Sequence, residues 1–191
     1  MELTEHKIFD KENFTKKPLP YGEYEYCTFN ACDFSGNDFK DFRFLECMFN
    51  GCNLSLVKLQ QTAFRDIQFK DCKMLGMRFE NCNPLGLTVA FDNCILDHCS
   101  FYQMKLKKTT FSNSRMHEVD LTQCDLSSCL FDNCDLFRAT FDDTIIEKAD
   151  FRSSFNYSID PDKNRIKKAK FSLAGLPGLL DKYDIEIDLH G

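Results

Sequence analysis

The chain has 191 residues, which suits one domain with at most a small appendage. Its net charge of −6 disfavours nucleic acid as a direct partner, and no apolar run approaches the ~18 residues of a membrane span. The first residues lack the basic and apolar regions of a signal peptide. We therefore expect a cytoplasmic protein that binds neither membranes nor nucleic acid directly.

A five-residue rhythm organises the sequence. Between Cys124 and Phe141 a large apolar residue recurs at every fifth position, and a small residue stands two places before each one. A period of five is neither the 3.6 of a helix nor the 2.0 of an isolated strand, so it indicates an internal repeat. We call these two recurring sites the large position and the small position.

The first 23 residues follow the rhythm only in part. Phe9, Phe14 and Leu19 occupy large positions, but Pro18 and Pro20 interrupt the pattern and lysines flank it. Terminal repeats are expected to be atypical and more polar than internal ones. The sequence therefore predicts an N-terminal cap over residues 1–23.

The regular array is predicted over residues 24–171. Of the 20 phenylalanines, 17 occupy large positions, and Phe42, Phe137 and Phe155 do not. The step from Phe79 to Phe91 is two residues longer than two repeats, so the frame slips within residues 80–90. Proline and glycine in this stretch suit a bulge that absorbs the extra residues. We interpret the slip as a structural joint rather than a binding loop.

Each repeat is expected to form one short side, with its large and small residues pointing inward and the other three facing water. Four sides close a square coil of about twenty residues, and successive coils stack at the ~4.8 Å spacing of strands, with backbone hydrogen bonds between them. Stacking buries a continuous core that no single coil could provide. The predicted fold is all-β, a quadrilateral parallel β-helix.

The 11 cysteines all fall on the small position of their frame, where a free thiol serves as a compact inward filler. The chain has no Cys-x-x-Cys pair, and its four histidines do not accompany cysteines at ligand spacing. We expect buried, reduced thiols, as in a reducing cytosol, and no metal or other cofactor.

The last part of the chain departs from the repeat. A polar loop is predicted over residues 154–165, after which Ile166 and Phe171 return to the rhythm. Residues 172–191 form a predicted capping or dimerisation tail, with helical spacing up to Tyr183, Pro177 near the helix start, and a strand-like alternation from Ile185 to Leu189. The predicted cap and dimer residues are Leu173, Leu176, Leu179, Leu180, Tyr183, Ile185 and Ile187.

Acidic residues concentrate in the second half of the array. From residue 116 to residue 150 the sequence has nine acidic and two basic residues, whereas residues 24–83 are nearly neutral. This stretch is a candidate partner-binding acidic patch, although carboxylates also serve simply as solvated surface. Its members are Glu118, Asp120, Asp125, Asp132, Asp135, Asp142, Asp143, Glu147 and Asp150.

No catalytic residues are predicted. The sequence has no Ser-His-Asp, Cys-His or phosphate-loop signature, and His98 and His117 fall on outward positions. A tightly filled square coil would also leave no interior cavity for a substrate. We therefore expect a binding protein and not an enzyme.

The repeat units resemble those of the pentapeptide repeat family. Cys32-Asp33-Phe34-Ser35-Gly36, Cys124-Asp125-Leu126-Ser127-Ser128 and Ala149-Asp150-Phe151-Arg152-Ser153 carry the resemblance, which covers about residues 24–153. It implies a right-handed quadrilateral β-helix. The Leu85-Gly86 break and the apolar tail are most similar to the quinolone-resistance group of Qnr-like and MfpA-like proteins.

That group implies a specific function. Its members join two rods through the tail into a homodimer that mimics duplex DNA and binds DNA gyrase or topoisomerase IV. The chain lacks the two longer loops of plasmid-type Qnr proteins. The alternative is a β-helical scaffold for another cytosolic partner with no role at a topoisomerase, and a third class is a β-helical enzyme acting on carbohydrate.

Overall fold

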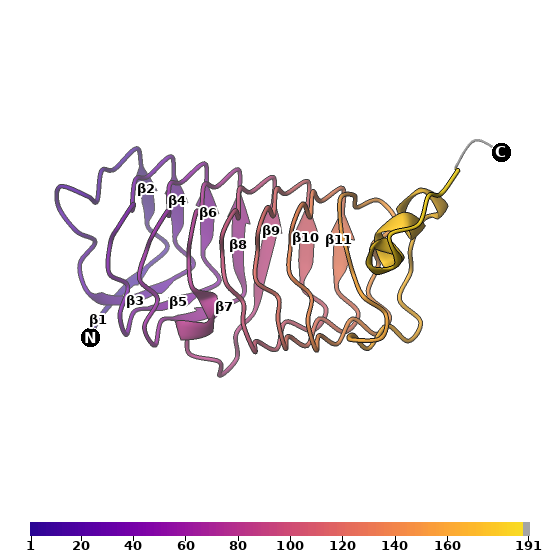
Figure 1. The fold of residues 1–191 in the computed structure, drawn as a ribbon. Helices are drawn as coiled ribbons and strands as arrows, with labels where there is room; N and C mark the ends of the chain where they lie inside the picture. Colours follow the sequence, from indigo (N-terminus) through magenta and orange to yellow (C-terminus); the bar gives the residue numbers. More distant parts are fainter. Residues whose placement is uncertain (189–191) are drawn as a thin grey trace.

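The computed structural model describes residues 1–188, which form a rod of stacked coils with the N-terminus at one end and the tail at the other (Figure 1). All strand pairings in this described part of the chain are parallel. The predicted quadrilateral β-helix is therefore confirmed. No helix within residues 1–188 has the length and apolarity that crossing a membrane requires.

Two of the four sides carry regular sheets. The first face holds the order β2-β4-β6-β8-β9-β10-β11, and the fourth face holds β1-β3-β5-β7. The first-face strands are β2 (Ile8–Asp10), β4 (Thr28–Asn30), β6 (Met48–Asn50), β8 (Ile67–Lys70), β9 (Val89–Asp92), β10 (Thr110–Ser112) and β11 (Leu130–Asp132). The fourth-face strands are β1 (Glu2–Glu5), β3 (Gly22–Glu25), β5 (Arg43–Leu45) and β7 (Ala63–Arg65).

The other sides are joined by single backbone bridges one coil apart. The second face includes the bridge from Arg115 to Asp135, and the third face includes the bridge from Ser100 to Asp120. The fourth face continues beyond its strands through bridges from Lys105 to Asp125 and onward to Arg165. Together with the five-residue repeat, these bridges identify the face on which an outward residue lies.

A column of phenylalanines runs the length of the rod behind the first face. Neighbouring rings in this column are stacked, with centroids between 4.6 and 5.5 Å apart. This spacing matches the ~4.8 Å separation of hydrogen-bonded strands, so ring stacking and backbone pairing share one period. The column comprises Phe9, Phe29, Phe49, Phe69, Phe91, Phe111, Phe131, Phe151 and Phe171.

The small position does more than fill space. Cys124 donates from Sγ to the carbonyl oxygen of Phe101 at 2.7 Å, and Thr62 and Ser154 donate their hydroxyls to the equivalent carbonyls one coil earlier. Each such side chain therefore satisfies a backbone acceptor next to the core. All 11 cysteines are free and buried, as the sequence predicts.

Most corners of the coil use a left-handed backbone conformation two residues after the large position. His98 (φ 59°) and Glu118 (φ 54°) are examples, and the pattern extends from the first coil to Lys168. This conformation costs an L-residue roughly 1–2 kcal/mol. It places the corner N–H to donate to the next coil, as His98 does to the carbonyl of His117 at 2.9 Å.

Residues 1–23 form a complete coil. β1 and β2 pair with β3 and β4, and Phe14 stacks on Phe34 with centroids 4.7 Å apart. Leu19 is buried as well. The segment predicted as a cap is thus built like the coils that follow it.

The frame slip is absorbed on one side of the rod. Phe69 pairs with Phe91, two residues more than the usual coil of twenty, and the first-face sheet continues without a break. A short 3-10 helix, η1 (Phe79–Asn81), precedes a loop over residues 82–88 that replaces a strand on the fourth face (Figure 1). Gly86 (φ 72°) permits the turn, because an L side chain rarely adopts that conformation.

The tail differs from its predicted form. It consists of two 3-10 helices, η2 (Leu173–Leu179) and η3 (Asp181–Tyr183), and Pro177 lies inside η2 rather than at its start. Pro177 with Gly175 and Gly178 disfavours an α-helix. The predicted strand is wrong over residues 185–188, which adopt no regular secondary structure, and Leu189 lies outside the described residues.

Phe131→Ala tests the stacked column. The side chain is fully buried between Phe111 and Phe151, so its truncation should lower the free energy of unfolding by about 3–5 kcal/mol in urea titrations. Phe137→Ala is the control, because this ring is 44% exposed and should cost less than about 1 kcal/mol. Equal losses for the two variants would contradict the inward assignment.

The buried thiols should make the fold sensitive to alkali. Burial raises the pKa of Cys99, Cys124, Cys129 and Cys134 to about 12, whereas an unfolded thiol titrates near ~8.5. Unfolding then releases protons above the unfolded pKa, so stability is complete below about pH 8.5 and falls as pH rises towards 12. Urea midpoints at pH 7.5 and about 10.5 measure the loss, and rapid alkylation of the native thiols at neutral pH would contradict their burial.

Candidate functional site

The nine acidic residues predicted as a partner-binding patch do not share one face. Backbone bridges and coil positions distribute them around the rod. The first face carries Asp132 and Asp150, the second Glu118 and Asp135, the third Asp120, Asp142 and Asp143, and the fourth Asp125 and Glu147.

Four of the nine carboxylates serve the turns of the coil. Asp120, Asp125, Asp135 and Asp150 each stand one residue before a large position and accept the backbone N–H two residues later, at 2.9 to 3.2 Å. Asp33 and Asn53 make the same bond elsewhere in the rod. An Asp or Asn here caps a turn, so its acidity alone does not indicate a binding role.

Five of the nine carboxylates also have cationic partners. Asp150 lies 2.8 Å from Arg152, whose hydrogen bonds lower the pKa of this carboxyl to about 2. Asp125 pairs with Lys107 at 3.1 Å, Asp135 with His117 at 2.7 Å and Glu147 with Arg165 at 2.8 Å. Glu118 lies between His98 and Arg138 at 3.5 and 3.8 Å. These pairs cancel much of the local charge on three faces.

The third face carries the three acidic side chains of this stretch that lie together without cationic partners among the described residues. Asp120, Asp142 and Asp143 occupy adjacent coils, since Gln123 N–H donates to the Asp142 carbonyl at 2.8 Å. Within residues 1–188 none of these three side chains forms an ion pair, and Asp142 and Asp143 are exposed. We call them the third-face carboxylates. Asp132, on the first face, instead accepts a hydrogen bond from Ser153 Oγ at 2.8 Å.

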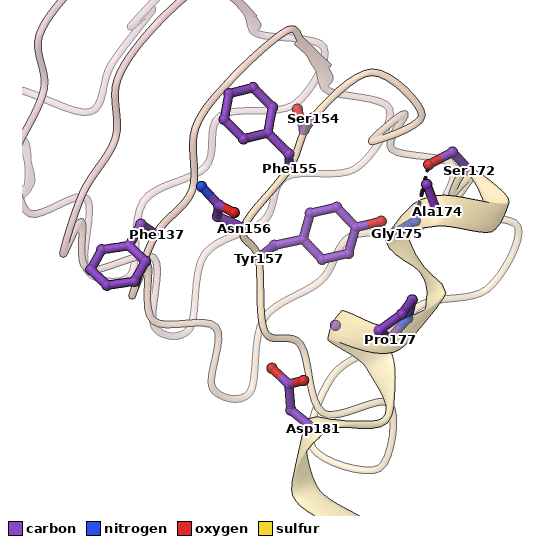
Figure 2. A pocket seen from close by; sticks show the side chains of 11 residues that line it. Phe137, Ser154, Phe155, Asn156, Tyr157, Ser172, Ala174, Gly175, Pro177 and Asp181 are labelled. Atoms are coloured by element: carbon purple, nitrogen blue, oxygen red, sulfur yellow. Dashed lines mark hydrogen bonds between the residues drawn. The ribbon is translucent and has the colours of Figure 1, made fainter. Parts of the chain in front are cut away.

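The tail closes the last coil by resting on Tyr157 (Figure 2). A Cβ added to Gly175 would overlap the Tyr157 hydroxyl oxygen, and one added to Gly178 would overlap the Tyr157 carbonyl oxygen. Ile159 N–H donates to the Gly178 carbonyl at 2.8 Å, and Lys182 pairs with Asp160 and Asp162 in the loop. The two glycines therefore allow the tail to lie directly against the array.

The tail exposes several large apolar side chains. Of its predicted residues, Leu173, Leu176, Tyr183, Ile185 and Ile187 are exposed, from 38% to 77%, whereas Leu179 and Leu180 are half-buried. A second apolar element lies beside them on the second face, where Phe137 and Phe155 are each nearly half exposed. A hollow of about 390 Å³ separates these rings from the tail.

Sequence reasoning missed Tyr157, Phe137 and Phe155 as parts of this end of the rod. Their positions outside the repeat were the available signal. Phe137 and Phe155 are exposed on the second face, whereas Tyr157 is buried beneath the tail. The Tyr157 hydroxyl is buried and finds no hydrogen-bond partner among the described residues. Nothing in residues 1–188 groups three or more His, Cys, Asp or Glu side chains as a metal site would.

Comparison with known sequences decides the family. The model of the family described as pentapeptide repeat region matches residues 23–84 and 87–156, more than half of the chain. The chain belongs to the pentapeptide repeat family. The two matched stretches meet at the loop that absorbs the frame slip, as expected where an irregular segment divides an array. A comparison with curated proteins finds no match.

Solved structures show the same architecture. A trypsin-treated variant of QnrB1, a plasmid-mediated fluoroquinolone resistance protein, matches with a TM-score of 0.66 at 15% identity, covering 98% of this chain and 100% of that one. Full-length QnrB1 matches with a TM-score of 0.60 at 17% identity over 96% and 100%. HetL from the cyanobacterium Nostoc sp. strain PCC 7120 matches with a TM-score of 0.40 at 12% identity over 90% and 86%. At these identities the likeness to QnrB1 shows the fold alone.

Proposed function

We propose that this chain is a non-enzymatic binding protein of the cytoplasm and that its partner is a type II topoisomerase, DNA gyrase or topoisomerase IV. The observation that carries the proposal is the likeness in fold to QnrB1 over the whole of both chains, because QnrB1 is a fluoroquinolone resistance protein. The sequence resemblance to the group that protects these enzymes supports the same partner.

The third-face carboxylates are the part of the rod best suited to meet a DNA-binding surface. Three carboxylates over two coils, about 10 Å of rod, compare with about six phosphates over the same length of duplex. The charge density is thus about half that of DNA. This supports local mimicry, in which Lys and Arg side chains of the enzyme pair with the third face instead of phosphates.

A solid interior favours binding over catalysis. The large positions fill the coil with side chains that are almost entirely buried, and the hollows of the described chain lie at its surface. A substrate would therefore have to bind outside the array. The eleven unpaired thiols support a reducing compartment for the protein.

The tail is the proposed dimer interface. The tail lies at one end of the rod (Figure 1), where a second copy would cover its exposed apolar side chains. The dimer would join two rods end to end, as the resemblance implies.

Charged substitutions in the tail test this interface. Ile185→Asp with Ile187→Asp should halve the mass measured by sedimentation in high salt, because both side chains are exposed and their change should not unfold the rod. Ile8→Asp with Leu56→Asp adds the same charge at exposed positions far from the tail and should leave the mass unchanged. A parent chain that is already monomeric would refute the interface.

Neutralising the third-face carboxylates tests the partner site. Asp120→Asn, Asp142→Asn and Asp143→Asn together should weaken binding to purified gyrase by about tenfold and flatten its salt dependence. The matched control changes Asp125, Asp135 and Asp150 to Asn, which removes the same charge from carboxylates already paired and retains an oxygen for each turn bond. It should change binding by less than about twofold.

Two outcomes separate the proposal from its alternative. Equal effects of the two triple variants would show that the third face is not the binding surface, but would not refute a topoisomerase as the partner. No binding of the parent chain to either topoisomerase, and no change in a supercoiling assay, would favour the scaffold for another cytosolic partner.

A further inference from the structure

The fourth face carries opposite charges on its two halves. The acidic half, before the loop of residues 82–88, has six carboxylates and two arginines, and the basic half, after the loop, has seven cations and two carboxylates. The acidic half comprises Glu2, Glu5, Glu23, Glu25, Glu46 and Asp66 with Arg43 and Arg65. The basic half comprises Lys105, Lys107, Lys108, Lys148, Arg165, Lys167 and Lys168 with Asp125 and Glu147.

These charges are available to a partner. All seven cations of the basic half are exposed, and its two carboxylates are half-buried and already paired with Lys107 and Arg165. The basic half therefore has a net charge of +5 on a protein whose total charge is −6. The acidic half has a net charge of −4, with Glu23 lying 3.8 Å from Arg43.

An apolar hollow separates the halves. Within residues 1–188, no backbone bridge joins the loop of residues 82–88 to the next coil on this face, which begins at Lys105. On the other three faces, backbone pairing between neighbouring coils continues past this loop. The gap has a volume of about 590 Å³ and is lined by Pro84, Leu87, Tyr102 and Met104 among others. Leu85, at its edge, is 72% exposed, and among residues 1–188 only Leu173 is a more exposed large hydrophobic residue.

We propose that the fourth face binds the fourth face of a second copy, with the two rods antiparallel and related by a two-fold axis through the hollow. An isologous contact of this kind satisfies both halves at once, because each acidic half meets a basic half. Residues at equal distances from the hollow then face each other. Glu2 and Glu5 oppose the coil of Arg165, Lys167 and Lys168, four coils from the axis.

The inner coils fit this arrangement as well. Arg43 stands two coils before the hollow and Asp125 two coils after it, so an arginine opposes a carboxylate. Arg65 opposes the coil of Lys105, but its side chain packs against Gly86 of its own loop, with Nε 3.3 Å from a Cβ placed there. The partner's Leu85 lies over the open hollow, where its apolar surface is covered.

A second copy fits better than a polyanion. The basic half spans four coils, roughly 15 Å at the spacing of strands, so a longer polyanion that lies along this face also meets the acidic half. The carboxylates that complement the basic half, in contrast, are present on the acidic half of any second copy. The contact is expected to be weak and sensitive to salt, since exposed charge pairs contribute little individually. It is distinct from the apolar tail interface, which salt should not dissolve.

Sedimentation of the full chain with charge reversals tests the proposal. Every chain in this test, the parent included, carries Ile185→Asp and Ile187→Asp, so that the tail interface does not add to the mass. The acidic-half variant carries Glu2→Lys, Glu5→Lys and Glu25→Lys, and the basic-half variant carries Lys148→Glu, Lys167→Glu and Lys168→Glu. The parent should have twice the mass in about 20 mM NaCl that it has in about 500 mM, as the Debye length falls from roughly 20 Å to roughly 4 Å. Each variant alone should associate at least about tenfold more weakly in low salt.

Mixing the two variants provides the decisive arm. The fourth face of the acidic-half variant is basic along both halves, and that of the basic-half variant is acidic along both halves. The mixture should therefore form a heterodimer in low salt. The control changes Lys40, Lys58 and Lys73, which are exposed on other faces, to Glu. It has the same net charge as the basic-half variant and should associate like the parent.

The proposal is wrong if the parent's mass does not depend on salt, if the control loses association equally, or if the mixture does not form the heterodimer. Binding of a duplex DNA probe by the basic half of a monomeric parent would assign this face to a polyanion instead.

Discussion

The stacking of phenylalanine rings along the first face is the constraint on which the rest of the rod depends. The ring separation and the strand separation are nearly equal, so the side-chain column and the backbone ladder repeat together. A residue inserted on this face would disrupt both. The two extra residues near position 85 are therefore absorbed on the fourth face, whose sheet stops at β7, while the seven-stranded sheet continues past the same level. The hollow and the separate halves of the fourth face follow from this asymmetry.

The same division between inward and outward positions determines what the surface can do. The core needs only the large and small residues, but an Asp or Asn directly before a large position also serves the fold through its turn bond. Asp125 and Asp150 are acidic at such positions, and each also pairs with a neighbouring cation. Asp142 and Asp143 stand after the large residue, where no turn bond is needed. Carboxylates of one stretch of sequence thus have different roles according to their place in the repeat.

Because core side chains fill the described coils, the sides and the ends of the rod are the surfaces that other molecules can contact. The third-face carboxylates, the apolar tail and the divided fourth face lie on different parts of that surface, so one contact need not exclude another. Burial of the eleven thiols and of the ring column keeps this surface fixed, because the backbone beneath it is held in every coil. Rigid presentation of charge reduces the ordering cost of binding.

The sequence by itself determined the repeat, the inward direction of the phenylalanines and cysteines, and the site of the frame slip, because a period of five leaves a side chain one direction to point. It also indicated the family. It could not show how the outward charges are grouped, since residues adjacent along the chain turn a corner onto different faces while residues twenty apart become neighbours. Only the tertiary structure divided the nine carboxylates among four faces, paired Asp135 with His117, and gathered Lys105 and Lys168 on one side. The form of the tail was likewise decided by packing on Tyr157, which no local pattern around Gly175 predicts.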